Sequence, residues 1–173
     1  MYDRENFKAR LDAYLAENFL EEDFFEEADE DIKFSKKFFA ASPRRSYRLK
    51  FNFKKIFEEN EGETFSEMMT RLVAESGEKN SAVYNRAQID RQLFSRIKKN
   101  KNYQPSKDTA VALALALKLD FDKAKDFLAA AGYALTKSKR DLIISFFIEN
   151  KIFDVGELND YLYEYDQPVL LGR

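Results

Sequence analysis

The amino-acid sequence predicts a mainly α-helical protein, and three observations support this fold class. Apolar residues recur at helical spacing along most of the chain. Residues that cap helices stand before several of these stretches. One long apolar run is made of Ala and Leu, which are among the best helix formers. With 173 residues, the chain is long enough for one domain with its own core, or for a small domain and an extension.

The first 60 residues are expected to form an N-terminal extension that is helical or of mixed α and β structure. Asn6–Leu20 has the apolar spacing of a helix, and the acidic stretch after it could continue as a second short helix. In Ser46–Phe53, aromatic and aliphatic residues alternate with Arg, Lys and Asn, which is the period of a strand. Ile32–Phe39 could pair with this strand across a turn at Ser42-Pro43, or another protein could supply the partner.

From residue 64 onward, the helix boundaries carry recognisable signals. Thr64 and Glu67 fit a capping box, and Gly77 is suited to end the helix that they begin. Asn100 is suited to a left-handed position after a later helix. The further helices are expected at about residues 81–87, 90–99, from 106, 122–131, from 136 or 138, and 156–163.

The helix expected from residue 106 contains a conflict between two signals. Val111, Leu113 and Leu115 alternate with alanines, and this alternation alone would favour a strand. Ala and Leu favour a helix, whereas strands favour β-branched and aromatic residues. Ser106 adds a suitable cap. We therefore expect a helix that is apolar on nearly all sides, which is typical of a buried central element.

The near-neutral net charge of −2 hides a strong separation of charge along the chain. Residues 1–35 are strongly acidic. Residues 36–57 contain eight Lys and Arg and no acid. Residues 86–107 contain seven basic residues against the single acid Asp90. Such basic blocks favour contact with phosphates or with acidic partners.

Several function classes are disfavoured by composition. The chain has no Cys and no His, which removes disulfides, thiolate nucleophiles and the usual zinc ligands. It shows no phosphate-binding Gly loop and no nucleophile–base pair. We therefore expect no enzyme, no cofactor and no metal. An apolar run near the length of a membrane span and a signal-peptide core are also missing, so the expected location is the cytoplasm.

A short helix, a tight turn, a second short helix, a basic loop and a buried helix form the layout of a helix-turn-helix DNA-binding domain. The stretch from Phe65-Ser66-Glu67-Met68 to Gly132-Tyr133-Ala134-Leu135 resembles the Cro/cI, or XRE-type, repressor family. Its centre is Ile89-Asp90-Arg91-Gln92-Leu93-Phe94-Ser95-Arg96-Ile97, followed by Tyr103-Gln104-Pro105-Ser106. Within that family it most resembles a C-terminal domain of Firmicutes proteins that sometimes follows a macro domain.

The resemblance implies a repressor-like five-helix domain over residues 63–135. Residues 136–173 would add two C-terminal helices packed on it. Three departures from the family pattern indicate divergent packing: Tyr84 replaces a usual Ala, Gln88 a usual Gly, and Lys98 and Asn100 stand in place of a common Glu-Asn-Gly ending.

The resemblance also implies that the helix at 90–99 enters the major groove of DNA. The residues expected to contact bases are Arg91, Gln92 and Ser95, because Arg matches guanine and Gln matches adenine. The residues expected to contact phosphates are Arg86, Arg96, Lys98, Lys99, Lys101 and Lys107. A secondary basic patch is expected at Arg44, Arg45, Arg48 and Lys50.

Two hypotheses of different classes follow. The first is a repressor-like transcriptional regulator that binds double-stranded DNA as a homodimer. The second is a protein–protein interaction module that uses the helix-turn-helix as a scaffold and captures a partner through residues 1–60, since fold does not dictate function.

Overall fold

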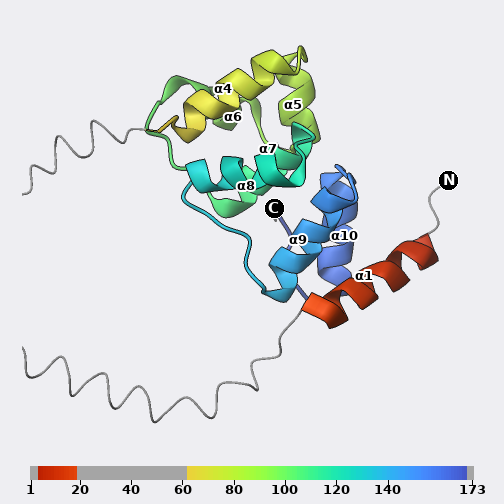
Figure 1. Ribbon diagram of the computed structural model, residues 1–173. Coiled ribbons are helices and arrows are strands. Elements are labelled where there is room, and N and C mark those ends of the chain that lie inside the picture. Colours follow the sequence, from red (N-terminus) through yellow and green to blue (C-terminus); the bar gives the residue numbers. More distant parts are fainter. Residues whose placement is uncertain (1–3, 19–61, 171–173) are drawn as a thin grey trace, which may run out of the picture. The chain divides into compact units, whose positions relative to one another are not determined.

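The structure is a computed structural model, and it describes residues 4–18 and 62–170 (Figure 1). Over these ranges it contains eight helices and no strand, which confirms the mainly helical fold. The helices are α1 (Arg4–Asn18), α4 (Phe65–Glu75), α5 (Asn80–Arg86), α6 (Arg91–Lys99), α7 (Lys107–Ala116), α8 (Phe121–Ala130), α9 (Lys139–Glu149) and α10 (Val155–Glu164).

The predicted strand at Ser46–Phe53, its proposed partner at Ile32–Phe39 and the acidic stretch at 21–31 all lie outside the described residues. None of the helices in the described ranges is long and apolar enough to cross a membrane.

Capping side chains set most of the helix starts. Thr64 and Glu67 form the expected reciprocal capping box at the start of α4. The side chains of Ser106 and Ser138 accept hydrogen bonds from backbone N–H groups in the first turns of α7 and α9. Asp120 caps α8, so this helix begins at Phe121, one residue before the expected Asp122. These bonds satisfy N–H groups that have no partner within the helix.

α7 lies at the centre of the core, and it is the helix that the Ala and Leu content predicted. Every residue from Thr109 to Ala116 is buried. α8 packs along α7, and α5 and α10 contact it as well. A strand would have placed alternate residues on two faces, whereas this helix is covered on all sides by other helices.

Two crossed ion pairs join the starts of α7 and α9. Lys107 donates to both carboxylate oxygens of Asp141, each at 2.7 Å. The guanidinium of Arg140 pairs with Asp108 at 2.7 Å and also donates to the carbonyl oxygen of Pro168. The ion pairs therefore connect the α4–α8 helices to the C-terminal helices.

Left-handed residues follow six of the described helices, and Gly77 at φ 66° takes the position after α4 that the sequence predicted. The other five share one bonding pattern. Gln88, Lys118, Gly132, Lys151 and Asp166 have φ between 53° and 77°, and only one of them is Gly. In each case the following N–H bonds back to the carbonyl five residues earlier in the chain, as Leu119 does to Ala114 at 3.2 Å. This is the Schellman arrangement. Asn100, which the sequence suggested for such a position, is instead extended at φ −108°, and its side chain accepts a bond from the N–H of Asn102.

Lys118→Gly is expected to raise the free energy of unfolding by about 0.5 kcal/mol. The left-handed conformation costs an L-residue about 1–2 kcal/mol, and Gly removes this cost. Part of the stabilisation is lost again, because Gly also gives the unfolded chain more conformational freedom. Lys118 is exposed, so little contact is lost. Urea denaturation measures the change. Lys118→Ala, which keeps the Cβ, should show no gain; a loss of stability in Lys118→Gly would contradict the prediction.

Candidate nucleic-acid interface

α6 is held against the domain by its apolar side. Phe94 and Ile97 are buried, and the ring of Phe94 packs at 5.7 Å from the ring of Tyr84 on α5. The buried hydroxyl of Ser66 on α4 donates to the carbonyl oxygen of Ile97 at 2.6 Å. These contacts fix the orientation of α6 relative to α4 and α5.

The turn between α5 and α6 spans residues 87–90. Ala87 is buried, and Gln88 adopts φ 55°, the left-handed conformation that Gly adopts at no steric cost. Asp90 then caps α6 by accepting from the N–H of Leu93 at 2.7 Å. The expected helix at 90–99 is therefore confirmed as a capped helix with a tight turn before it.

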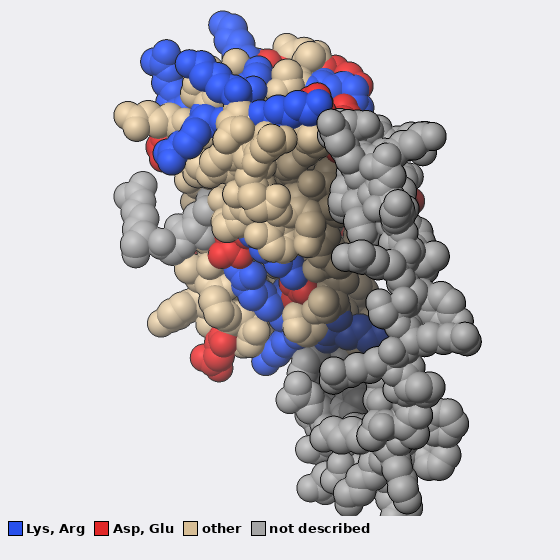
Figure 2. Space-filling model, turned by 90° about the vertical axis from the view of Figure 1, so that its left-hand side faces the viewer, with Lys and Arg blue, Asp and Glu red and all other residues tan. Residues whose placement is uncertain are grey.

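The outward side of α6 carries the residues that the sequence analysis singled out. Arg91, Gln92 and Arg96 are exposed, and Ser95 is half-buried. These four residues and Lys99 together line one open depression of the surface. Figure 2 shows Lys and Arg side chains gathered over the end of the molecule that carries α4 to α6.

The cations of this surface are largely free of internal partners. α6 itself contains four basic residues and no acid. Within residues 4–18 and 62–170, no carboxylate forms an ion pair with Arg91, Arg96 or Lys99. A cationic helix side of this kind is suited to an anionic partner, because no ion pair with the described part of the chain must be broken to bind it.

Two further basic residues have weak internal contacts. Lys98 donates to the side-chain oxygen of Asn80 at 3.4 Å, and its ammonium lies 6.0 Å from the centre of the Phe94 ring. Lys101 pairs with Glu67 at 3.1 Å, where both side chains are exposed. Bonds from the backbone N–H and the hydroxyl of Thr64, and then Lys101, lower the pKa of Glu67. Exposed pairs of this kind contribute little to stability and can be exchanged for phosphate contacts.

Arg86 and Lys107 differ from the other expected phosphate contacts, because both are engaged inside the domain. Arg86 bonds to Glu78 at 2.6 Å and to the carbonyl oxygen of Ala116 at 2.7 Å, at the end of α7. Lys107, which is half-buried, pairs with the buried Asp141. Their charges are already compensated within the domain, so an anionic partner would have to displace these contacts to bind them.

The start of α5 is an addition that the sequence analysis missed. The bond between Lys98 and Asn80 brings this helix end beside the end of α6, and the exposed Lys79 directly precedes it. No side chain caps α5 at Lys79, so the capping signals used elsewhere did not mark this position. The secondary patch expected at Arg44, Arg45, Arg48 and Lys50 lies outside the described residues.

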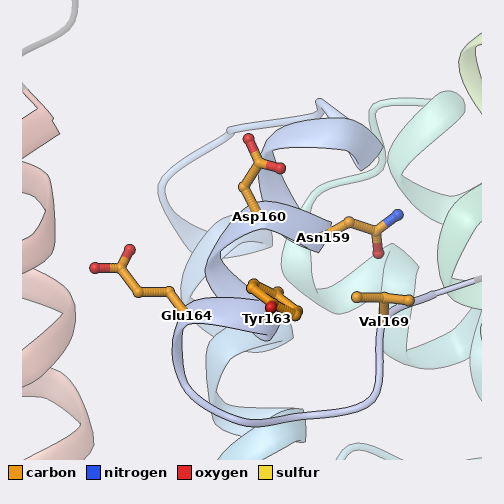
Figure 3. Close-up of a pocket in the computed structure, with 5 residues that line it drawn as sticks. All are labelled: Asn159, Asp160, Tyr163, Glu164 and Val169. Atoms are coloured by element: carbon orange, nitrogen blue, oxygen red, sulfur yellow. The ribbon is translucent and has the colours of Figure 1, made fainter.

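A second depression lies on α10 and the tail that follows it, and Asn159, Asp160, Tyr163, Glu164 and Val169 line it (Figure 3). Tyr163 is the one large hydrophobic side chain strongly exposed within the described ranges, at 79%. Glu164 points toward α1, where Lys8 pairs with it. The two carboxylates make this surface unsuited to DNA.

Within the described ranges, no group of acidic side chains is arranged to hold a metal ion. Comparison with protein-family models, with curated proteins and with solved structures gives no match to the chain.

Proposed function

We propose that the protein binds double-stranded DNA through α6 and acts as a repressor-like transcriptional regulator. In this proposal α4 to α8 form a repressor-type helix-turn-helix domain, with α5 and α6 as its two characteristic helices. The observation that carries the proposal is the outward side of α6, where Arg91, Arg96 and Lys99 form no ion pair with any described residue and line one depression with Gln92 and Ser95.

The dimensions of α6 suit the major groove. An α-helix with its side chains is about 10–12 Å across, which matches the groove width of about 12 Å, and the nine residues of α6 extend over about 14 Å. Arg91 and Gln92 occupy the first turn, the part of such a helix that contacts base edges. Each matched bidentate pair discriminates between bases by about 1–3 kcal/mol.

The remaining cations would position the helix on the backbone. Arg96, Lys98, Lys99 and Lys101 flank the base-contacting residues and would neutralise phosphates, and Lys79 extends the same surface. A regulator of this type binds as a homodimer to two half-sites about 34 Å apart.

The double variant Arg91→Ala/Arg96→Ala tests the proposal. It is expected to weaken binding to duplex DNA by at least about 30-fold, because two contacts are lost and each is worth about 1 kcal/mol or more. The slope of log K against log salt should fall in magnitude by about 0.9 for each phosphate contact removed. Sequences selected from random duplex DNA at near-physiological salt supply the probe, and fluorescence anisotropy measures the affinity.

The matched control is Lys123→Ala/Lys125→Ala on α8. It removes the same charge, but from exposed lysines paired with Asp120 and Asp122. Its affinity should stay within a few-fold of the parent protein. Equal losses in both double variants would indicate a nonspecific charge effect, and no binding of the parent protein to duplex DNA would overturn the proposal.

A protein–protein interaction module is the second candidate. It is favoured by α1, which docks on α9 and α10 on a surface separate from α6. Deleting residues 1–60 separates the candidates: loss of partner capture with DNA binding intact would support the interaction module.

A further inference from the structure

α1 covers an aromatic face formed by α9 and α10 (Figure 1). Phe7, Leu11 and Leu15 are buried there, at the i, i+4 and i+8 positions of one helix side. The Phe7 ring lies 5.2 Å from Phe146 and 5.0 Å from Tyr161, measured between ring centres. The surface of α9 and α10 that α1 covers, here called the groove, therefore takes an apolar stripe with a bulky aromatic group at its start.

Polar contacts around the groove match α1 residue by residue. Lys8 pairs with Glu164, the hydroxyl of Tyr165 donates to Asp12, and Arg10 donates to Asn150. The hydroxyl of Tyr14 lies 3.5 Å from Glu149. The groove thus selects both an apolar stripe and the charges beside it.

α1 needs its contacts with α9 and α10 to be a stable helix, whereas α9 and α10 have contacts with other helices as well. α1 has 15 residues, a length at which an isolated helix is only marginally stable in water. Residues 19–64 separate it from α4 along the chain, whereas α9 and α10 also pack on α8, α7 and one another. Release of α1 therefore leaves the remaining helices in contact, and it should need less free energy than global unfolding.

We propose that the α9–α10 face is a helix-binding groove and that α1 is its replaceable occupant. The partner that fits is an amphipathic helix of another protein with Phe, Leu and Leu at i, i+4 and i+8, a cation at i+1 and a carboxylate at i+5. Such a helix binds when α1 releases. This inference is independent of DNA binding, because it uses neither α6 nor the residues around it.

A labelled peptide of residues 4–18 serves as the probe on the full chain. The peptide should bind the parent protein weakly, because α1 competes for the groove and lowers the fraction of open molecules. Leu11→Ala in the protein, which weakens α1 but leaves the groove unchanged, should tighten peptide binding at least tenfold. The matched control Glu17→Ala, at an exposed position of α1, should leave it unchanged.

The peptide carrying Phe7→Ala and Leu11→Ala should not bind. The proposal is overturned if this peptide binds as well as the parent peptide, or if Leu11→Ala protein fails to bind the parent peptide while it remains helical by circular dichroism.

Should Leu11→Ala unfold, Lys8→Ala/Asp12→Ala removes two exposed contacts of α1 instead and should tighten peptide binding several-fold. No change in peptide affinity would then overturn the proposal. Dimers of the parent protein at micromolar concentration that disappear in Leu11→Ala would assign the groove to a second copy and exclude a different partner.

Discussion

Asp141→Ala is expected to lower the free energy of unfolding by about 3–5 kcal/mol. The carboxylate is only 3% exposed, and it accepts bonds from Lys107 and from the N–H and hydroxyl of Thr136 at 2.7–2.8 Å. Removing Asp141 leaves the half-buried ammonium of Lys107 without its compensating charge. Lys107 would lose its partner at the start of α7, and Thr136 would lose its acceptor.

Urea denaturation at neutral pH measures this loss. Asp126→Ala on α8 is the matched control, because Asp126 is exposed, and its effect should stay within about 0.5 kcal/mol. The double variant Lys107→Met/Asp141→Leu should recover much of the stability, since an apolar pair can replace a buried ion pair. A loss below about 1 kcal/mol in Asp141→Ala would show that the pair does not hold α7 to α9.

The same carboxylate adds a dependence on pH. Burial alone would raise the pKa of Asp141, but the bonds from Lys107 and Thr136 outweigh it, so the pKa lies below its usual range. The stabilisation is therefore fully present above the unfolded value of about pH 4 and is lost as the pH falls through the folded value. Asp141→Asn should flatten the fall in stability below pH 4.

Phe94→Ala is expected to cost about 3–5 kcal/mol of stability. Phe94 is 3% exposed on the inner side of α6 and packs on Tyr84, and removal of a buried Phe leaves a cavity that the neighbours fill only in part. Phe94→Leu should cost clearly less. Thermal unfolding measures both variants.

A comparison along α6 separates its two sides. Arg91→Ala/Arg96→Ala should leave the melting temperature within a few degrees of the parent protein, because both side chains are exposed. Phe94→Ala should lower it strongly. If the arginine variant melted as early as Phe94→Ala, α6 would depend on Arg91 or Arg96 for its folding, and a loss of DNA binding could not be assigned to the interface.

Local signals in the sequence were sufficient for the positions of most helices. The capping residues Thr64, Ser106 and Ser138 mark helix starts because each bonds to N–H groups within three residues of itself. The helical state of 107–116 followed from its Ala and Leu content despite its alternating pattern. The exposure of Arg91, Gln92 and Arg96 on α6 followed from the apolar spacing of Phe94 and Ile97 on its other side.

Other features could not be predicted, because they depend on residues far apart in the sequence. Arg86 and Lys107 have the same local character as Arg96, but carboxylates and a carbonyl of other elements compensate their charges. The left-handed turns at Gln88, Lys118 and Lys151 escaped prediction for a different reason: local backbone bonds close them, and no Gly marks them in the sequence.

The helical character of α1 and the location of α6 were thus determined by the sequence itself, since period and caps act over a few residues. The docking of α1 on α9 and α10, and the choice of which cations remain unpaired, were decided by the tertiary structure alone, since burial and ion pairing depend on which distant side chains meet.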